Sequence, residues 1–156
     1  MSSMAGFTFV LVDEPSLRDL KNLEQAMLKF LHYIGYLPEE NPKSAGYRLL
    51  TECFLAHPTR AFTVDELLDL LGLGKNRSTL YYYLNKLKGY ELLDEVQVEL
   101  EEPLGEGERK KTRKAYRLKF GDFRMAFNIT LKKAESVLDV YRDNVDHLAK
   151  LLKDSL

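Results

Sequence analysis

The chain of 156 residues has no tryptophan, a single cysteine and three histidines. The lone Cys53 excludes a disulfide within the chain and argues against a structural zinc cluster. Cys53 lies in the apolar run 49–55, which predicts a small buried core residue. His32, His57 and His147 fall on different expected elements, with no carboxylate or cysteine at metal-ligand spacing on a helix face. We therefore expect no metal site.

Signatures of catalysis and of membrane insertion are also missing. The glycines at 72–74 and 105–107 are typical of turns rather than of a phosphate-binding loop between a strand and a helix. No serine, cysteine or aspartate has the surroundings of an activated nucleophile. The apolar run 7–12 is too short to cross a bilayer, and no signal peptide is visible. We therefore expect a cytoplasmic protein that is not an enzyme and has no cofactor.

The composition that remains is that of a soluble globular protein, with 45% hydrophobic and 30% charged residues. A formal net charge of −1 does not indicate a nucleic-acid binder. Whether the chain can bind nucleic acid therefore depends on how its charges are distributed locally. We expect a mainly helical α+β fold with one small β-hairpin. Its expected parts are an N-terminal arm and helix over 1–43, a central domain over 44–120, and a long C-terminal helix over 121–156.

The stretch from Phe62 to Tyr90 predicts a helix, a tight turn and a second helix. Thr63 and Glu66 have the spacing of a capping box at the start of the first helix. Gly72 can adopt the left-handed conformation that ends this helix. Asn76 is a suitable N-cap for the second helix. The segment therefore has the order of a helix-turn-helix motif.

The second of these helices has two different faces. Leu80, Tyr83, Leu84 and Leu87 recur at helical spacing and predict the buried face. Polar, aromatic and basic side chains, almost without acid, occupy the other face and the N-terminal end. They are Lys75, Asn76, Arg77, Ser78, Thr79, Tyr81, Tyr82, Asn85 and Lys86. Such side chains can hydrogen-bond base edges and meet phosphates, although an outer face that is only solvated is the alternative interpretation.

Residues 91–100 and 112–120 predict the two strands of a hairpin, with a short strand at 61–62 beside them. Their expected apolar positions are Leu93, Val96, Val98 and Leu100, then Ala115, Tyr116, Leu118 and Phe120. The first strand is acidic and the second is basic, so antiparallel pairing would place opposite charges side by side. The cations expected at or near the tip, as candidates for phosphate contact, are Arg109, Lys110, Lys111 and Arg113.

The run HPTRAFTVDELLDLLGLGKNRSTLYYYLNKL, followed by this hairpin, resembles the winged helix-turn-helix of MarR/GbsR-type transcriptional regulators of archaea and bacteria. The resemblance covers 57–120, under half of the chain. It implies that the helix at 76–88 enters the major groove and that the hairpin, with its wing at 101–113, touches the flanking backbone. One departure from the family is the unusually acidic first strand of the wing.

Residues 123–156 contain neither glycine nor proline and predict one long helix. Their apolar positions recur at steps of four and three, the signature of a coiled-coil seam. They are Phe127, Leu131, Ala134, Leu138, Tyr141, Val145, Leu148 and Leu152. A helix of about 33 residues would span about 50 Å, more than the domain it follows. We therefore predict that part of this stripe meets another chain; the alternative is packing against an N-terminal helix over 15–36.

Three functions remain open from the residues. The first is a sequence-specific transcriptional regulator that binds double-stranded DNA as a homodimer. The second is a winged-helix adaptor for protein–protein interaction that does not bind DNA. The third is a regulator with an unknown small-molecule effector, in a pocket lined by Tyr33, Tyr36 and Tyr47.

Overall fold

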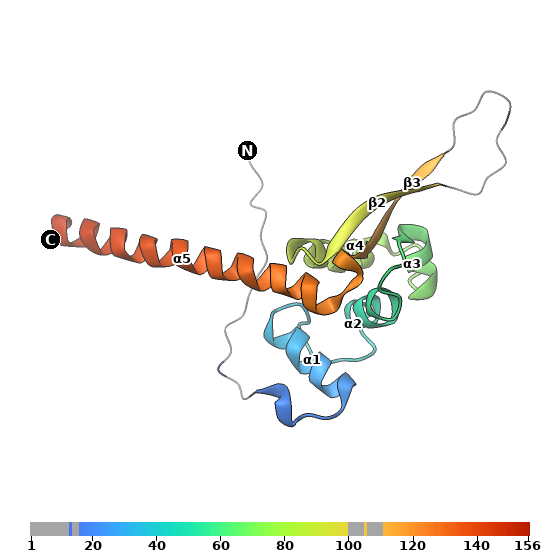
Figure 1. Ribbon diagram of the computed structural model, residues 1–156, viewed down its shortest axis with the longest axis horizontal. Coiled ribbons are helices and arrows are strands. Elements are labelled where there is room, and N and C mark those ends of the chain that lie inside the picture. Colours follow the sequence, from blue (N-terminus) through green and yellow to red (C-terminus); the bar gives the residue numbers. More distant parts are fainter. Residues whose placement is uncertain (1–12, 14–15, 100–104, 106–110) are drawn as a thin grey trace.

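The computed structural model describes residues 13, 16–99, 105 and 111–156. Over these residues it is a mixed α+β structure in which helices predominate. The elements are η1 (Leu17–Asp19), α1 (Leu23–Tyr33), α2 (Ala45–Arg48), η2 (Leu49–Leu55), β1 (Phe62–Thr63), α3 (Val64–Leu70), α4 (Arg77–Gly89), β2 (Leu93–Glu99), β3 (Thr112–Leu118), η3 (Lys119–Gly121) and α5 (Phe123–Ser155). A body is formed by α1 to α4 and the sheet, and α5 projects from it (Figure 1). None of the helices in the described ranges has the length and apolarity to span a membrane.

The sheet has three antiparallel strands in the order β1-β3-β2. The short strand β1 pairs with β3 at Phe62 opposite Tyr116, which confirms the expected short strand, shifted by one residue. Leu93 pairs with Leu118, and both face the core. Val96 and Val98 lie on the other face of β2, because side chains alternate along a strand.

The segment from α3 to α4 has the local structure that its sequence predicts. Thr63 and Glu66 form a complete capping box, and Gly72 has a positive φ of 66°. Burial opposes ionisation of Glu66, but hydrogen bonds from Arg60 and Thr63 outweigh it and lower the pKa of this carboxyl. The side chain of Asn76 accepts a hydrogen bond from the backbone N–H of Thr79 and caps α4. The turn between the helices is therefore held by local hydrogen bonds.

Residues 45–55 form one helical segment, in which α2 is followed without a break by η2, which has π-helical hydrogen bonding. Its residue Gly46 lies directly beneath α4. A Cβ atom at this position would stand 2.4 Å from the Tyr83 ring, so the close approach requires glycine. The Tyr36 hydroxyl donates a 2.6 Å hydrogen bond to the Gly46 carbonyl. These contacts fix α4 against the centre of the body.

The structure corrects two expectations about element boundaries. The N-terminal helix expected from residue 15 or 16 is interrupted, because α1 begins only at Leu23. The Asn22 side chain accepts from the backbone N–H of Gln25, and this N-cap competes with a continuous helix. Phe120, expected to point inward from the second hairpin strand, lies in η3 with φ 61° and is 56% exposed. The chain turns there to enter α5, so β3 ends at Leu118.

The long C-terminal helix is confirmed as α5, and Asp122 caps it through the backbone N–H of Met125. Its first two turns belong to the body. Ala126 and Phe127 are buried, and the Phe127 ring packs against Phe30 with centroids 5.3 Å apart. Thr130 is fully buried and donates a hydrogen bond to the Tyr90 carbonyl. One turn later Lys133 still forms a 2.8 Å ion pair with Glu91, and beyond this contact the helix leaves the body (Figure 1).

Candidate nucleic-acid interface

The two faces of α4 differ sharply in burial. Leu80, Leu84 and Leu87 are at most 1% exposed and hold the helix in the core. On the other face Tyr82 is 53% exposed and Tyr81 is 38% exposed. The sequence assigned these residues to opposite faces correctly, and Ser78 and Asn85 are exposed as well. The structure therefore presents a polar and aromatic helix face on a helix whose inner side is packed in the core.

At the N-terminal end of α4 the candidate residues have different partners. The Asn76 side chain accepts from the Thr79 backbone N–H and from the Ser78 hydroxyl, so its amide oxygen serves the cap. Lys75 is exposed in the turn before the helix. Arg77 donates a 2.8 Å hydrogen bond to the carboxylate of Asp65 on α3. Of this group, Asn76 has the clearest structural role.

Asp65 joins two of the candidate cations. Its second carboxylate oxygen accepts from Arg113 of β3, so one acid bridges Arg77 and Arg113. These side chains and Lys114 line a cleft of about 310 Å³, together with Thr63 and Val64. Three cations and one carboxylate leave the cleft with a net positive charge, at the point where the starts of α3 and α4 meet β3. An oxyanion such as a phosphate would be attracted to this cleft.

Lys86, expected to contact phosphate, is turned toward the body. Its ammonium group donates to the carbonyls of Gly35 and Tyr36 at 3.2 and 2.9 Å, and lies 4.9 Å from the centroid of the Tyr82 ring. These two carbonyls follow the end of α1, where a cation is favoured. The structure therefore gives Lys86 a role in joining α1 to α4, at the edge of the exposed face.

The hairpin carries its charges in opposed pairs along the described parts of both strands. Asp94 lies opposite Arg117, and Glu95 makes ion pairs with Lys114 at 3.7 Å and with Lys88 of α4 at 2.7 Å. The hydrogen bond from Lys88 lowers the pKa of Glu95 and raises the pKa of Lys88 itself. The acidic strand is thus partly neutralised by its neighbours, as the sequence led us to expect.

The expected tip cations can be placed only in part. Arg109 and Lys110 lie outside the described residues, as does most of the expected wing at 101–113. Lys111 is exposed where β3 begins, and Arg113 is held by Asp65. Sequence reasoning missed Asp65, Lys88 and Lys114 as part of this surface. An acid in the first turn of a helix is already explained by the helix dipole, so nothing local marked Asp65 as a bridge.

A second hollow, of about 500 Å³, lies between the start of α1 and the segment α2–η2. It is lined by Asn22, Leu23, Glu24, Met27, Tyr47, Thr51, Leu55 and Ala56. Of the three tyrosines expected to line an effector pocket, only Tyr47 reaches it. Tyr36 is fully buried in the core, where burial raises its pKa well above the usual value. Among the described residues that line the hollow, Glu24 is the only charged group that could orient a ligand.

Cys53 and His32 are the next candidates for chemical reactivity, and both make contacts that serve the fold. Cys53 is 2% exposed, and burial raises the pKa of its thiol to about 11, which leaves it protonated and unreactive. His32 Nδ1 lies 2.9 Å from the Leu37 carbonyl oxygen and completes the chain reversal after α1. The described residues contain no cluster of three or more histidine, cysteine, aspartate or glutamate side chains suited to a metal ion.

The stripe expected to form a dimer interface is divided by the structure. Phe127 is buried within its own body, Ala134 is half-buried, and the large apolar residues after Thr130 are exposed. The exposed fractions run from 40% to 64% for Leu131, Leu138, Tyr141, Val145, Leu148 and Leu152. The alternative of packing against the N-terminal helix therefore accounts only for the first turns of α5.

The geometry thus brings a polar helix face, a cationic cleft and a charged hairpin together on the body, and leaves a bare apolar stripe on α5. Comparison with protein-family models, with curated proteins and with solved structures gives no match for this chain. The resemblance to MarR/GbsR-type regulators therefore stays a prediction that depends on the residues at 57–120.

Proposed function

We propose that this chain is a sequence-specific transcriptional regulator of the winged helix-turn-helix type that binds double-stranded DNA as a homodimer. In this proposal α4 enters the major groove, and the β2–β3 hairpin lies along the flanking backbone. The observation that carries the proposal is the outer face of α4, which is exposed, polar, aromatic and free of acid, on a helix whose inner leucines are fully buried.

The dimensions of α4 support this function. A helix of 13 residues is about 20 Å long, and with side chains it is about 10–12 Å wide, which matches the width of the major groove. Ser78, Tyr82 and Asn85 would then face base edges. The cleft at the N-terminal end of α4 carries three cations that would lie toward the phosphates beside the groove: Arg77, Arg113 and Lys114.

An adaptor that binds protein rather than DNA is the second candidate, and it rests on the charge pairing. The net charge is −1, and Asp65 neutralises part of the charge of Arg77 and Arg113. Such a surface attracts DNA less than an unpaired basic one, because non-specific DNA affinity depends on the number of phosphates neutralised. The two candidates therefore differ in salt-dependent DNA binding.

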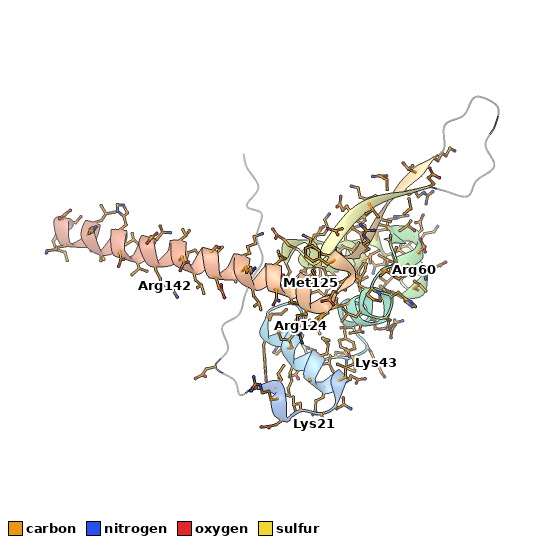
Figure 2. All side chains as sticks on the ribbon, in the orientation of Figure 1. Lys21, Lys43, Arg60, Arg124, Met125 and Arg142 are labelled. Atoms are coloured by element: carbon orange, nitrogen blue, oxygen red, sulfur yellow. The ribbon has the colours of Figure 1, made fainter. Side chains whose placement is uncertain are left out.

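The test is a selection from randomised duplex DNA with the full chain at low salt. We expect a two-fold symmetric motif, since a dimer presents two copies of α4. The double variant Tyr82→Ala with Asn85→Ala should lose the enrichment. Lys43→Ala is a matched surface control on the loop before α2, away from α4 (Figure 2). If the wild type enriches no motif and does not bind heparin or DNA at low salt, the adaptor becomes the better interpretation.

A further inference from the structure

The large apolar side chains of α5 beyond Thr130 are all exposed in the part of the chain that the structure describes. Tyr141, Val145 and Leu152 are each 60% exposed or more, and they lie on one side of a helix that has left the body. A continuous apolar stripe of this length is unusual on the surface of a monomer and marks an interaction site. Its four–three spacing fits the same stripe on another helix.

We propose that this face pairs with the α5 helix of a second copy, that the two helices run antiparallel, and that Leu138 and Tyr141 lie next to the two-fold axis. The inference rests on the proposed homodimer and adds its orientation and register. In heptad positions, Leu131, Leu138 and Val145 occupy a, and Ala134, Tyr141 and Leu148 occupy d.

Antiparallel pairing in this register gives a complete apolar seam. Leu131 faces the partner's Leu148, Ala134 faces the partner's Val145, and Leu138 faces the partner's Tyr141. The two-fold axis repeats each of these layers, so six layers form without a charged side chain. The small Ala134 lies opposite Val145, and the large Tyr141 lies opposite Leu138. No layer therefore pairs two small side chains or two aromatic ones.

The charges beside the seam distinguish the two orientations. Glu135 and Arg142 both occupy position e, and in an antiparallel pair e lies beside e of the partner. Glu135 would therefore meet the partner's Arg142, and symmetry gives this pair twice. In a parallel pair e lies beside g, and the g positions carry no charge to match. They are Thr130, Val137, Asn144 and Leu151.

Arg142 is available for such a contact. It pairs within its own helix with Asp139 at 2.6 Å, but both side chains are more than 70% exposed, so the ion pair is weak and exchangeable. Figure 2 shows Arg142 on the projecting part of α5, well away from the body. Its long side chain can therefore reach a helix that packs along the stripe.

Antiparallel pairing also gives the far end of α5 a place to pack. Leu151 is 48% exposed, and this pairing carries it toward the partner's body. The two copies of Phe127 would be about 37 Å apart along the helix axis. That separation is close to the roughly 34–36 Å between half-sites one turn apart on DNA.

The test uses cysteine cross-linking, for which the chain is well suited because its own Cys53 is buried with a thiol pKa of about 11. Ala134→Cys and Val145→Cys are prepared as separate proteins. Mixed and oxidised, they should form a disulfide-linked heterodimer, because the two positions face each other across the seam. Each variant alone should form none, since its two copies would be about 16 Å apart. Wild type is the control for Cys53.

Cross-linking of either variant alone would overturn the antiparallel orientation. A wild type that is monomeric by light scattering at tens of micromolar would overturn the homodimer and this inference together. If the heterodisulfide forms but the protein selects no DNA motif, the antiparallel pairing is supported and the proposed DNA-binding function is contradicted. The two proposals can therefore fail separately.

Exchanging the charges of Glu135 and Arg142 is a second test of the proposed register. Glu135→Arg should raise the dimer dissociation constant by roughly threefold to tenfold, because two attractive contacts become repulsive. Adding Arg142→Glu should restore it. Asp139→Asn is the matched control, since it removes the intrahelical partner of Arg142 and leaves the seam unchanged. Equal weakening by the single and the double exchange would contradict the register.

Discussion

The helices α4 and α5 differ in the kind of face that they leave exposed. In α4 the leucines are buried within the body, and the exposed side is polar, aromatic and basic. In α5 beyond Thr130 the apolar stripe itself is exposed. A polar face costs the isolated fold little, whereas an apolar one favours association in water. The partners that we propose differ in the same way: a hydrated polyanion for α4 and an apolar helix for α5.

The largest expected effect comes from replacing apolar side chains on the exposed side of α5 with polar ones. Replacing Leu138 and Val145 with Asp puts unpaired charges into the proposed seam, where burial of a charge is very costly. We expect a monomer of 18.1 kDa by light scattering, with the body still folded by circular dichroism. The control is Ser136→Asp with Lys150→Asp, two exposed positions on the opposite side of the helix. If both double variants have the same mass as wild type, the stripe is not the interface.

The next effect removes the polar character of α4. Tyr82→Ala with Asn85→Ala should reduce binding to a selected DNA site by about 1–3 kcal/mol for each base that is no longer read, while non-specific binding persists at low salt. The melting temperature should hardly change, because exposed substitutions shift stability by less than about 0.5 kcal/mol. Competition binding and thermal melting together check this expectation. A double variant that binds its site as well as wild type would exclude this face from base reading.

The sequence was most informative where structure depends on neighbours along the chain. The capping box at Thr63, the N-cap at Asn76 and the uninterrupted α5 all follow from residues within one or two turns. The two faces of α4 follow from its periodicity. These features determine the support of the candidate site, and they were predictable because capping and periodicity are local.

Features that depend on distant contacts were not predictable. Lys86 binds carbonyls of Gly35 and Tyr36, which lie about fifty positions earlier in the chain. Asp65 meets Arg113 only because β3 folds back beside α3. The number of basic residues therefore overstates the free positive charge of the site, since partners distant in sequence already engage several of them.

A smaller effect concerns the cations expected at the hairpin tip. Replacing Arg109, Lys110 and Lys111 with Ala should weaken binding similarly on all DNA sequences, in contrast to changes on α4. The slope of log affinity against log salt should flatten by roughly 0.9 for each phosphate that the protein no longer neutralises. Affinities measured at several salt concentrations, on specific and random duplexes, check this. An unchanged slope would mean that these cations balance the acidic strand and do not bind DNA.

The smallest expected effect comes from removing the charge of Asp65. Among the described residues that line the cationic cleft beside α4, Asp65 is the one acid. The Asp65 side chain is 49% exposed, and those of Arg77 and Arg113 are 54% and 51% exposed, so their ion pairs contribute at most about 1 kcal/mol to folding. Asp65→Asn should leave the fold intact and free both guanidinium groups for phosphates. Affinity for random DNA should then rise, most clearly at low salt where screening is weak.

Asp69→Asn is the control for this last change, because it removes the same charge one turn further along α3, at an exposed position. A gain common to both variants would reflect only the change in net charge. A gain specific to Asp65→Asn would show that this carboxylate competes with phosphate for Arg77 and Arg113. A specific decrease would show the reverse, namely that Asp65 holds the two arginines in position to bind DNA. The DNA-binding surface would then include α3 as well as α4 and the hairpin.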